Sequence, residues 1–122
     1  MKGKKERRMY RRYPVRDGVV AVLSPCCNIT GQIINISKGG LTFRYLFNAE
    51  QVVSRAATEV CLRRNGVCIE MLPCTTVSDR EVRHDGDRRD LKTRERRIRF
   101  GELSYHKATQ LNHFLHANAV DR

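Results

Sequence analysis

Short apolar runs separated by turn residues cover most of the chain after Gly18, and they predict β-strands. Each run is rich in β-branched residues and ends at Gly, Pro, Asn or Ser, as strands that are followed by turns do. The first half of the chain holds three such runs, Val19–Leu23, Ile29–Ile36 and Leu41–Leu46. Two more, Thr58–Leu62 and Val67–Val77, follow in the second half.

A hairpin is expected between the last two of these runs. Asn65-Gly66 lies between them, and both residues tolerate positive φ, so the pair predicts a two-residue turn. The pattern is less decisive in Asn48–Ala57, where Val52 and Val53 stand among good helix formers. A helical turn and a long connection both fit that stretch.

The pattern changes twice more before the chain ends. Arg83–Glu95 is polar and crowded with charge, and it predicts an exposed loop. Arg96–Leu103 then predicts a final strand with one buried face, because Ile98 and Phe100 alternate with arginines.

A helix over Ser104–Ala117 is expected to close the sequence. Leu111, Phe114 and Leu115 have helical spacing, and Ser104 is a suitable N-cap. Several short antiparallel strands followed by one helix predict a β-barrel or sandwich with the helix packed against it.

The start of the chain is a basic arm. Residues 1–16 carry eight Lys and Arg side chains and one acid, Glu6. The whole chain has 24 Lys and Arg, 13 Asp and Glu, and a formal net charge of +11, so anions such as nucleic acids, nucleotides and acidic membranes are candidate partners. Residues 1–13 hold too little apolar surface to order by themselves, and we expect a flexible arm.

Length and composition indicate the number of domains, the cellular location and the state of the cysteines. A chain of 122 residues suits one domain with one modest core. No stretch approaches the roughly 18–20 apolar residues of a membrane span, and the charged start lacks the apolar region of a secretory signal, so we expect a cytoplasmic protein. The cysteine count is odd, at five, which argues against a disulfide framework and for reduced thiols.

Catalytic and metal chemistry find no support in the sequence. It contains no Ser-His-Asp order, paired-carboxylate motif or phosphate loop, so no catalytic residue and no cofactor is expected. Cys61, Cys68 and Cys74 lack CxxC spacing and are expected to be buried small hydrophobes rather than metal ligands. His113 and His116 lie one helical turn apart, and we expect them to be solvated.

Two motifs carry the functional information. Arg8 and Arg12 form an RxxxR element in the basic arm. Asn35, Ser37 and Gly40 form an NxSxxG element between two predicted strands. Each motif is common by itself, whereas their order, spacing and strand context make the joint signal stronger. Together they resemble the signature of the PilZ family, whose members bind the anionic dinucleotide cyclic di-GMP.

The resemblance implies a fold. It predicts a small antiparallel six-stranded, split-barrel-like β-barrel with a C-terminal α-helix and a flexible basic N-terminal arm. In this chain the arm is 1–13 and the barrel domain is 14–118, with its helix over 104–117. The similarity continues through Ile98–Leu103 and is weakest across 47–95.

The resemblance also implies residue roles that suit the ligand chemically. Arg8 and Arg12 would contact guanine and phosphate, because a guanidinium donates to both O6 and N7 of guanine. Asn35 and Ser37 would recognise a guanine from the barrel side, and Gly40 would shape the turn. Secondary candidates are Arg7, Arg11, Lys38 and Gly39. A register shifted by one residue would make Arg7 and Arg11 the RxxxR pair.

Functionally, we expect a non-catalytic bacterial receptor whose arm orders on cyclic di-GMP and then signals to a partner protein, as a monomer or dimer. One alternative is a basic nucleic-acid-binding barrel, which is less favoured because aromatic residues are few and Trp is absent. Another is a ligand-free adaptor of the same fold. The Asn35–Gly40 segment also fits an ordinary turn, in which Asn35 and Ser37 cap backbone groups and the glycines adopt positive φ.

Overall fold

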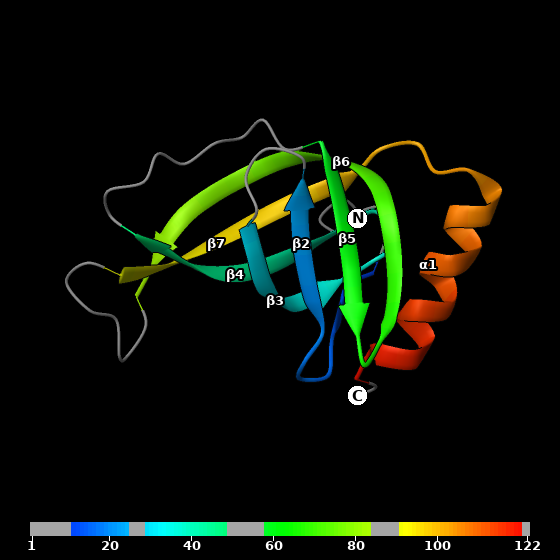
Figure 1. The fold of residues 1–122 in the computed structure, drawn as a ribbon, viewed down its shortest axis with the longest axis horizontal. Helices are drawn as coiled ribbons and strands as arrows, with labels where there is room; N and C mark the ends of the chain where they lie inside the picture. Colours follow the sequence, from blue (N-terminus) through cyan, green and yellow to red (C-terminus); the bar gives the residue numbers. More distant parts are fainter. Residues whose placement is uncertain (1–10, 25–28, 49–57, 84–90, 121–122) are drawn as a thin grey trace, which may run out of the picture.

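The structure is a computed structural model that describes residues 11–24, 29–48, 58–83 and 91–120 (Figure 1). These residues form seven strands and one helix. The strands are β1 (Tyr13–Pro14), β2 (Val20–Ser24), β3 (Ile29–Ile36), β4 (Gly40–Asn48), β5 (Glu59–Arg64), β6 (Val67–Val82) and β7 (Leu91–Phe100). The helix α1 spans Tyr105–Asn118.

Six of the strands close into an antiparallel barrel. Their order is β3-β2-β5-β6-β7-β4, and β4 pairs with β3 again to complete the circle. The short strand β1 adds to β3 through Tyr13 and Pro14, which lie opposite Ile36 and Asn35. The expected six-stranded barrel is therefore confirmed, with one extra strand beside it. The predicted Asn65-Gly66 hairpin is also confirmed, since the two residues join β5 to β6 with φ of 51° and 83°.

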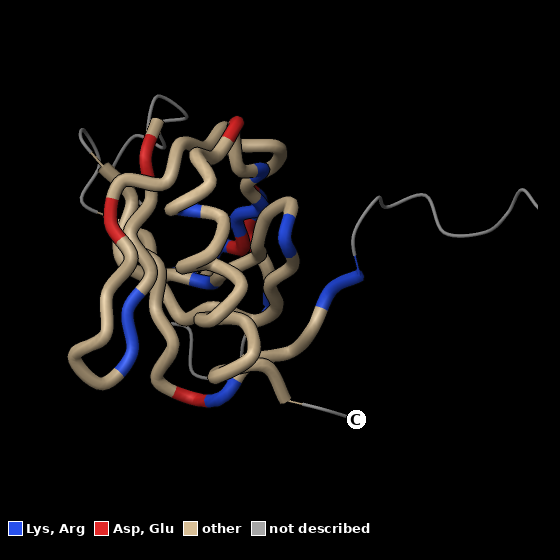
Figure 2. The backbone as a smooth tube through the Cα atoms, turned by 90° about the vertical axis from the view of Figure 1, so that its right-hand side faces the viewer, with Lys and Arg blue, Asp and Glu red and all other residues tan. Residues whose placement is uncertain are grey.

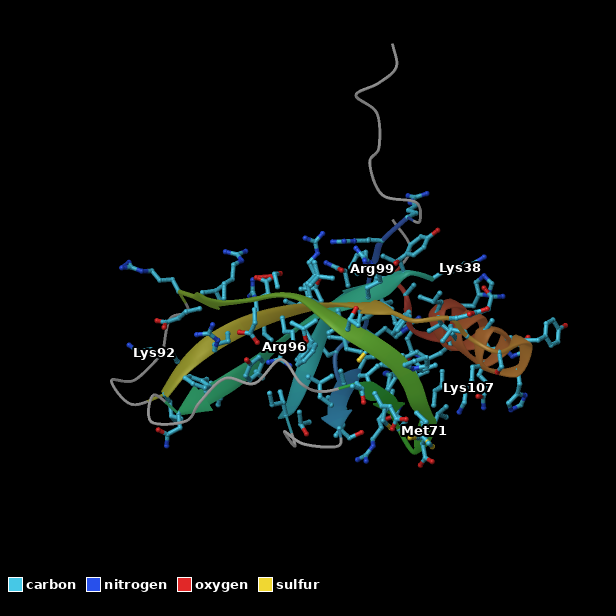
Figure 3. All side chains as sticks on the ribbon, turned by 90° about the horizontal axis from the view of Figure 1, so that it is seen from above. Lys38, Met71, Lys92, Arg96, Arg99 and Lys107 are labelled. Atoms are coloured by element: carbon cyan, nitrogen blue, oxygen red, sulfur yellow. The ribbon has the colours of Figure 1, made fainter. Side chains whose placement is uncertain are left out.

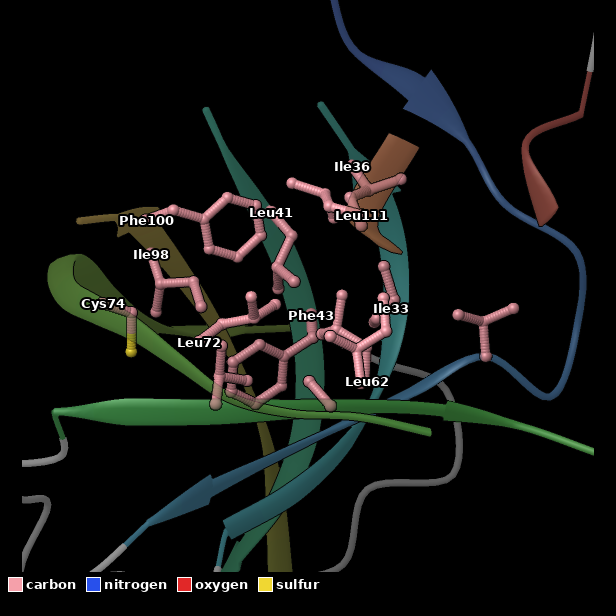
Figure 4. Packing of buried hydrophobic residues seen from close by; sticks show 14 of the residues in the cluster. Ile33, Ile36, Leu41, Phe43, Leu62, Leu72, Cys74, Ile98, Phe100 and Leu111 are labelled. Atoms are coloured by element: carbon pink, nitrogen blue, oxygen red, sulfur yellow. The ribbon is translucent and has the colours of Figure 1, made fainter. Parts of the chain in front are cut away.

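The core fills the barrel and continues under the helix (Figure 4). Alternate residues of the strands point inward, as Leu41 and Phe43 do on β4 and Ile98 and Phe100 do on β7. Helix α1 lies at one end of the barrel alongside β6 (Figure 1). Its buried side chains are apolar except for Asn118, and the apolar ones, Leu111, Phe114 and Leu115, join the core cluster.

The helix begins where the sequence predicted. Ser104 is the N-cap, and its hydroxyl oxygen accepts a hydrogen bond from the Lys107 backbone N–H at 3.1 Å. Ser104→Ala should therefore lower the free energy of unfolding by about 1 kcal/mol, because one N–H of the first turn loses its acceptor. Urea denaturation measures this difference. Ser104→Asp provides the comparison, since it retains a capping oxygen and should stay near the wild-type value.

Three strand boundaries predicted from the sequence were wrong. The predicted loop Arg83–Glu95 is partly strand, because β7 begins at Leu91, and the strand predicted to end at Val77 continues to Val82. The last strand ends at Phe100 rather than Leu103. The predicted Asn48–Ala57 connection lies outside the described residues except for Asn48, which ends β4.

An ion cluster explains why charged segments form strands here. Asp79 of β6 has a side chain only 1% exposed, and its carboxylate accepts from Arg94 Nε at 2.5 Å and Arg96 Nε at 2.7 Å. The Tyr45 hydroxyl donates to the same carboxylate. Arg96 is fully buried and shares the inward face of β7 with Ile98 and Phe100. Polar residues that satisfy one another inside the barrel replace the apolar residues expected of a strand.

The cluster shifts two pKa values. Burial raises the pKa of Tyr45 to about 12, with the hydrogen bond to Asp79 acting in the same direction. Burial also favours the neutral form of Asp79, but the hydrogen bonds from Tyr45, Arg94 and Arg96 outweigh it and lower the pKa of Asp79. The cluster is therefore a carboxylate held between two cations.

The cysteine expectation holds in part. Cys74 is buried in the core, as predicted. Cys61 and Cys68 are only half-buried, and they lie on the outer side of β5 and β6, where the neighbours Leu62 and Ile69 point inward. The prediction that they are buried hydrophobes was wrong, because strand alternation turns them away from the core.

Candidate ligand site

A row of cross-strand partners crosses the outside of the barrel and contains a predicted site residue. Pro14 of β1 lies opposite Asn35 of β3, and Asn35 lies opposite Thr42 of β4. Thr42 in turn lies opposite Arg97 of β7, which lies opposite Ser78 of β6. Four of these strands, β3, β4, β7 and β6, thus place polar side chains side by side, with Pro14 of β1 at the end of the row.

A pocket of about 190 Å³ lies over this row. Its lining residues come from the start of the described chain and from β3, β4, β6 and β7, and they are Arg12, Asn35, Thr42, Ser78, Arg80, Glu95 and Arg97. The structure therefore brings together Arg12 and Asn35, one residue from each predicted motif. Tyr13 follows Arg12 and pairs with Ile36, the residue after Asn35. This strand pairing holds Arg12 close to Asn35.

The side-chain carbonyl of Asn35 is available for a ligand. Its oxygen Oδ1 is buried and has no hydrogen-bond partner within the described part of the chain. Leaving a buried acceptor unsatisfied costs about 1–3 kcal/mol, so this atom requires a donor from a water molecule or from a ligand in the pocket. Guanine presents N–H donors of this kind.

The pocket is positively charged. Arg12, Arg80 and Arg97 line it, whereas Glu95 is the acid among the described lining residues. Arg80 lies 3.4 Å from Glu95, and Arg44 lies 3.9 Å from it on the other side, so this acid is offset by two cations. Basic residues also mark the start of the described chain beside the barrel (Figure 2), and Lys38 and Arg99 lie along the same side (Figure 3). An anion is the ligand that this charge distribution favours.

Ser37 has a structural task in the loop after β3. It is 5% exposed, and its hydroxyl oxygen accepts from the backbone N–H groups of Gly39 at 3.0 Å and Gly40 at 3.2 Å. The hydroxyl also lies 3.3 Å from the Gly40 carbonyl, to which it donates. Ser37 is not among the pocket-lining residues. The capping part of the ordinary-turn interpretation therefore applies to this residue, and a direct role in binding stays a prediction.

Gly40 is required for a different reason from the one expected. Its φ lies outside the positive range, so the turn does not need glycine for its conformation. A Cβ at this position would instead lie 2.2 Å from the carbonyl oxygen of Ile98 on β7, which is closer than side-chain carbons approach. The loop motif thus fixes how tightly β4 packs beside β7.

Gly40→Ala should consequently destabilise the barrel by about 1–3 kcal/mol, because the two paired strands must move apart to admit one methyl group. Equilibrium denaturation followed by circular dichroism measures the loss. Lys38→Ala is the matched control in the same loop, since Lys38 is exposed and its replacement should change stability by less than about 0.5 kcal/mol. Equal stability of the Gly40 and Lys38 variants would contradict the packing argument.

The remaining predicted residues lie in different places. Arg7 and Arg8 fall outside the described residues. Arg11 is exposed, and its guanidinium lies 5.3 Å from the ring centre of Tyr13 rather than in the pocket. Lys38 is exposed in the loop, and the Gly39 carbonyl accepts from the Phe100 backbone N–H at 2.9 Å. The position of Arg12 in the pocket favours the register in which Arg8 and Arg12 form the RxxxR pair.

Sequence reasoning missed the far wall of the pocket. Thr42, Ser78, Arg80, Glu95 and Arg97 line it, and none of them was a candidate. Three of the five belong to the segment 47–95, where the resemblance is weakest. Outward positions of β7 alternate with buried ones, so Arg97 carried a detectable signal of a surface-facing cation beside the motif.

The described residues contain neither a metal-binding cluster nor a helix that could span a membrane. No three His, Cys, Asp or Glu side chains there come together in a way that could hold a metal ion. In the same part of the chain, no helix has the length and apolarity that crossing a membrane requires. His113 and His116 are exposed on α1, as expected.

The described residues form a small barrel with a basic pocket, and comparison with known proteins specifies the fold. No protein-family model and no curated protein sequence matches the chain. Its structure is similar to the PilZ domain with c-di-GMP of YcgR from Escherichia coli, with a TM-score of 0.65 and 14% sequence identity. The match covers 92% of this chain and 91% of that chain. The chain therefore has a PilZ-type fold.

Proposed function

We propose that the protein is a cyclic di-GMP receptor of the bacterial cytoplasm and that it acts without catalysis. Binding would take place in the pocket over β3, β4, β6 and β7, with the RxxxR element of the arm as its second half. The similar YcgR domain was solved with c-di-GMP, which supports the ligand assignment.

The unsatisfied carbonyl of Asn35 is the observation that carries this proposal. A guanine in the pocket would supply the missing donor through its ring N–H or its amino group. Arg97 and Arg12 line the same pocket, where their guanidinium groups would donate to a phosphate or to the guanine O6 and N7 atoms. One ligand would thereby satisfy a neutral acceptor and several cations together.

The pocket is small compared with cyclic di-GMP, so we expect the arm to complete the binding site. A pocket of about 190 Å³ is small for a molecule with two guanines and two phosphates. Arg12 already lines the pocket, and Arg8 precedes it by four residues in the sequence, so we expect the arm to cover the part of the ligand outside the pocket. Ordering the arm costs about 1–2 kcal/mol per residue fixed, which the arginine contacts must exceed. The ordered arm and ligand would then form a new surface for a partner protein.

Titration calorimetry of the full chain with cyclic di-GMP tests the proposal. We expect saturable binding that a salt increase weakens only in part, because hydrogen bonds to the guanines are not screened as phosphate contacts are. Single-stranded oligonucleotides in the same buffer are the comparison, and their binding should collapse as salt rises. Absence of cyclic di-GMP binding at both salt concentrations would reject the receptor function and leave the adaptor alternative.

Asn35→Ala sharpens this test, because the substitution removes the acceptor without removing a charge. Its cyclic di-GMP affinity should fall while oligonucleotide binding stays the same.

A further inference from the structure

Two cysteines meet on the outer side of the β5–β6 hairpin, away from the core. Cys61 belongs to β5 and Cys68 to β6, and their sulfur atoms lie 2.8 Å apart. Both side chains are half-buried, so a small reagent in solvent has access to them. On the turn side of the pair, Leu62 lies opposite Ile69 and Arg63 lies opposite Cys68, whereas the register of the two strands shifts between Val60 and Leu62, at Cys61.

A cation accompanies the two sulfurs. The Arg63 guanidinium hydrogen-bonds Cys61 and also Cys68, and these contacts raise the pKa of Arg63. Burial raises the pKa of Cys61, the contact with Cys68 acts in the same direction, and Arg63 opposes both. Because the pKa of Cys61 is raised on balance, the case for exchange rests on the short distance between the two sulfurs and on their access to solvent.

Cys74 offers a contrast within the same strand. It is 5% exposed in the core, and burial raises its pKa to about 11. Cys74 is expected to be inert because its thiol is buried away from reagents, whereas Cys61 and Cys68 are half-exposed and adjacent.

We propose that Cys61 and Cys68 are a dithiol modification site that closes reversibly to an intramolecular disulfide by exchange with a low-molecular-weight disulfide such as oxidised glutathione. One protein thiolate attacks a sulfur of the glutathione disulfide, breaks its S–S bond and releases one glutathione. The second protein thiol loses its proton and attacks the protein sulfur of the mixed disulfide, which forms the Cys61–Cys68 bond and releases the second glutathione. Two electrons and two protons pass from the protein to glutathione.

The closed form would tie β5 covalently to β6 beside the turn at Asn65-Gly66. The bridge is distinct from the ligand pocket, because neither sulfur is among the residues that line the pocket over β3, β4, β6 and β7. Bridges across short loops stabilise a fold less than bridges across long ones, so the expected gain in thermal midpoint is a few degrees.

The test equilibrates the full chain with graded ratios of oxidised to reduced glutathione, traps free thiols with N-ethylmaleimide, and measures intact mass and tryptic peptides. Trypsin cleaves after Arg63 and Arg64, between the two cysteines, so a closed bridge joins two peptides that otherwise separate. We expect a joined Cys61–Cys68 species lighter by two hydrogens, which dithiothreitol reverses and which forms faster at higher pH.

Variants make the result specific. Cys61→Ser and Cys68→Ser should each abolish the bridge, whereas Cys74→Ser should leave it unchanged. Circular dichroism shows whether each variant is folded. The tryptic peptide Asn65–Arg80 holds Cys74 as well as Cys68, so fragmentation of the joined wild-type peptides in the mass spectrometer is needed to locate the bridge. Full alkylation of Cys61 and Cys68 at every glutathione ratio would overturn the proposal, as would a bridge that joins either residue to a different cysteine.

Discussion

Replacing Asp79 by alanine should lower the free energy of unfolding by about 3–5 kcal/mol, the largest loss expected of any single change considered for this chain. Asp79 accepts from Arg94, Arg96 and Tyr45 inside the barrel, and its carboxylate is the shared partner of all three. Without it, the fully buried Arg96 keeps its charge and loses its counterion. A buried charge without compensation is far more costly than a lost surface ion pair.

Urea denaturation of the two proteins measures the loss. Glu81→Ala is the matched control, because Glu81 is an exposed acid on the same strand, two residues further along. That variant should change the free energy of unfolding by less than about 0.5 kcal/mol. A loss below about 1 kcal/mol for Asp79→Ala would show that the cluster contributes little to stability.

The same cluster gives the protein a characteristic response to acid. Because the pKa of Asp79 is lower in the folded protein than in the unfolded chain, the unfolded chain binds more protons between those two values. The contribution of Asp79 to stability is therefore complete above its ordinary pKa of about 4 and is lost as the pH falls toward the folded value. Unfolding measured between about pH 6 and pH 3 should show a shallower loss of stability for Asp79→Ala than for the wild type.

How far the sequence predicts this fold depends on which residues face the core. Strands with apolar inward positions, such as Val20–Ser24 and Gly40–Asn48, were found from their pattern, and the Asn65-Gly66 turn followed from local conformational preference. The last residues of β6 and the first residues of β7 were not found, because both stretches are rich in charge, with Asp79 in one and Arg94 in the other. Their pairing depends on residues distant in the sequence, which a local pattern does not contain.

The candidate site likewise contains residues that the sequence predicted and residues that only the structure revealed. Asn35 and Arg12 were identified from their motifs, and both line the pocket. Ser37 and Gly40 were identified as well, but the structure explains them by a capped turn and by close packing of β4 against β7. Arg97 was missed because its place beside Asn35 arises from strand order, with Thr42 between them. A motif located one wall of the pocket, whereas the barrel topology supplied the other.

Replacing both Arg8 and Arg12 by alanine should weaken cyclic di-GMP binding by about 2–6 kcal/mol, or at least roughly 30-fold, while the barrel stays folded. Each guanidinium offers a planar pair of donors for guanine or phosphate, and each single loss is expected to cost about 1–3 kcal/mol. Arg12 lines the pocket, so its removal alters the site directly. Arg12 is half-exposed and precedes the first barrel strand, so stability should change little.

The matched control separates the motif from the general charge of the arm. Lys4→Ala together with Lys5→Ala removes the same two positive charges from the same arm and leaves the RxxxR element intact. If the arm acts only by long-range attraction, both double variants should lose affinity equally, and the loss should disappear as salt rises. If Arg8 and Arg12 contact the ligand directly, only the arginine variant should lose most of its affinity, and this loss should persist at high salt. Arg7→Ala with Arg11→Ala tests the register in the same way. A larger loss of affinity in that variant would show that Arg7 and Arg11, rather than Arg8 and Arg12, contact the ligand.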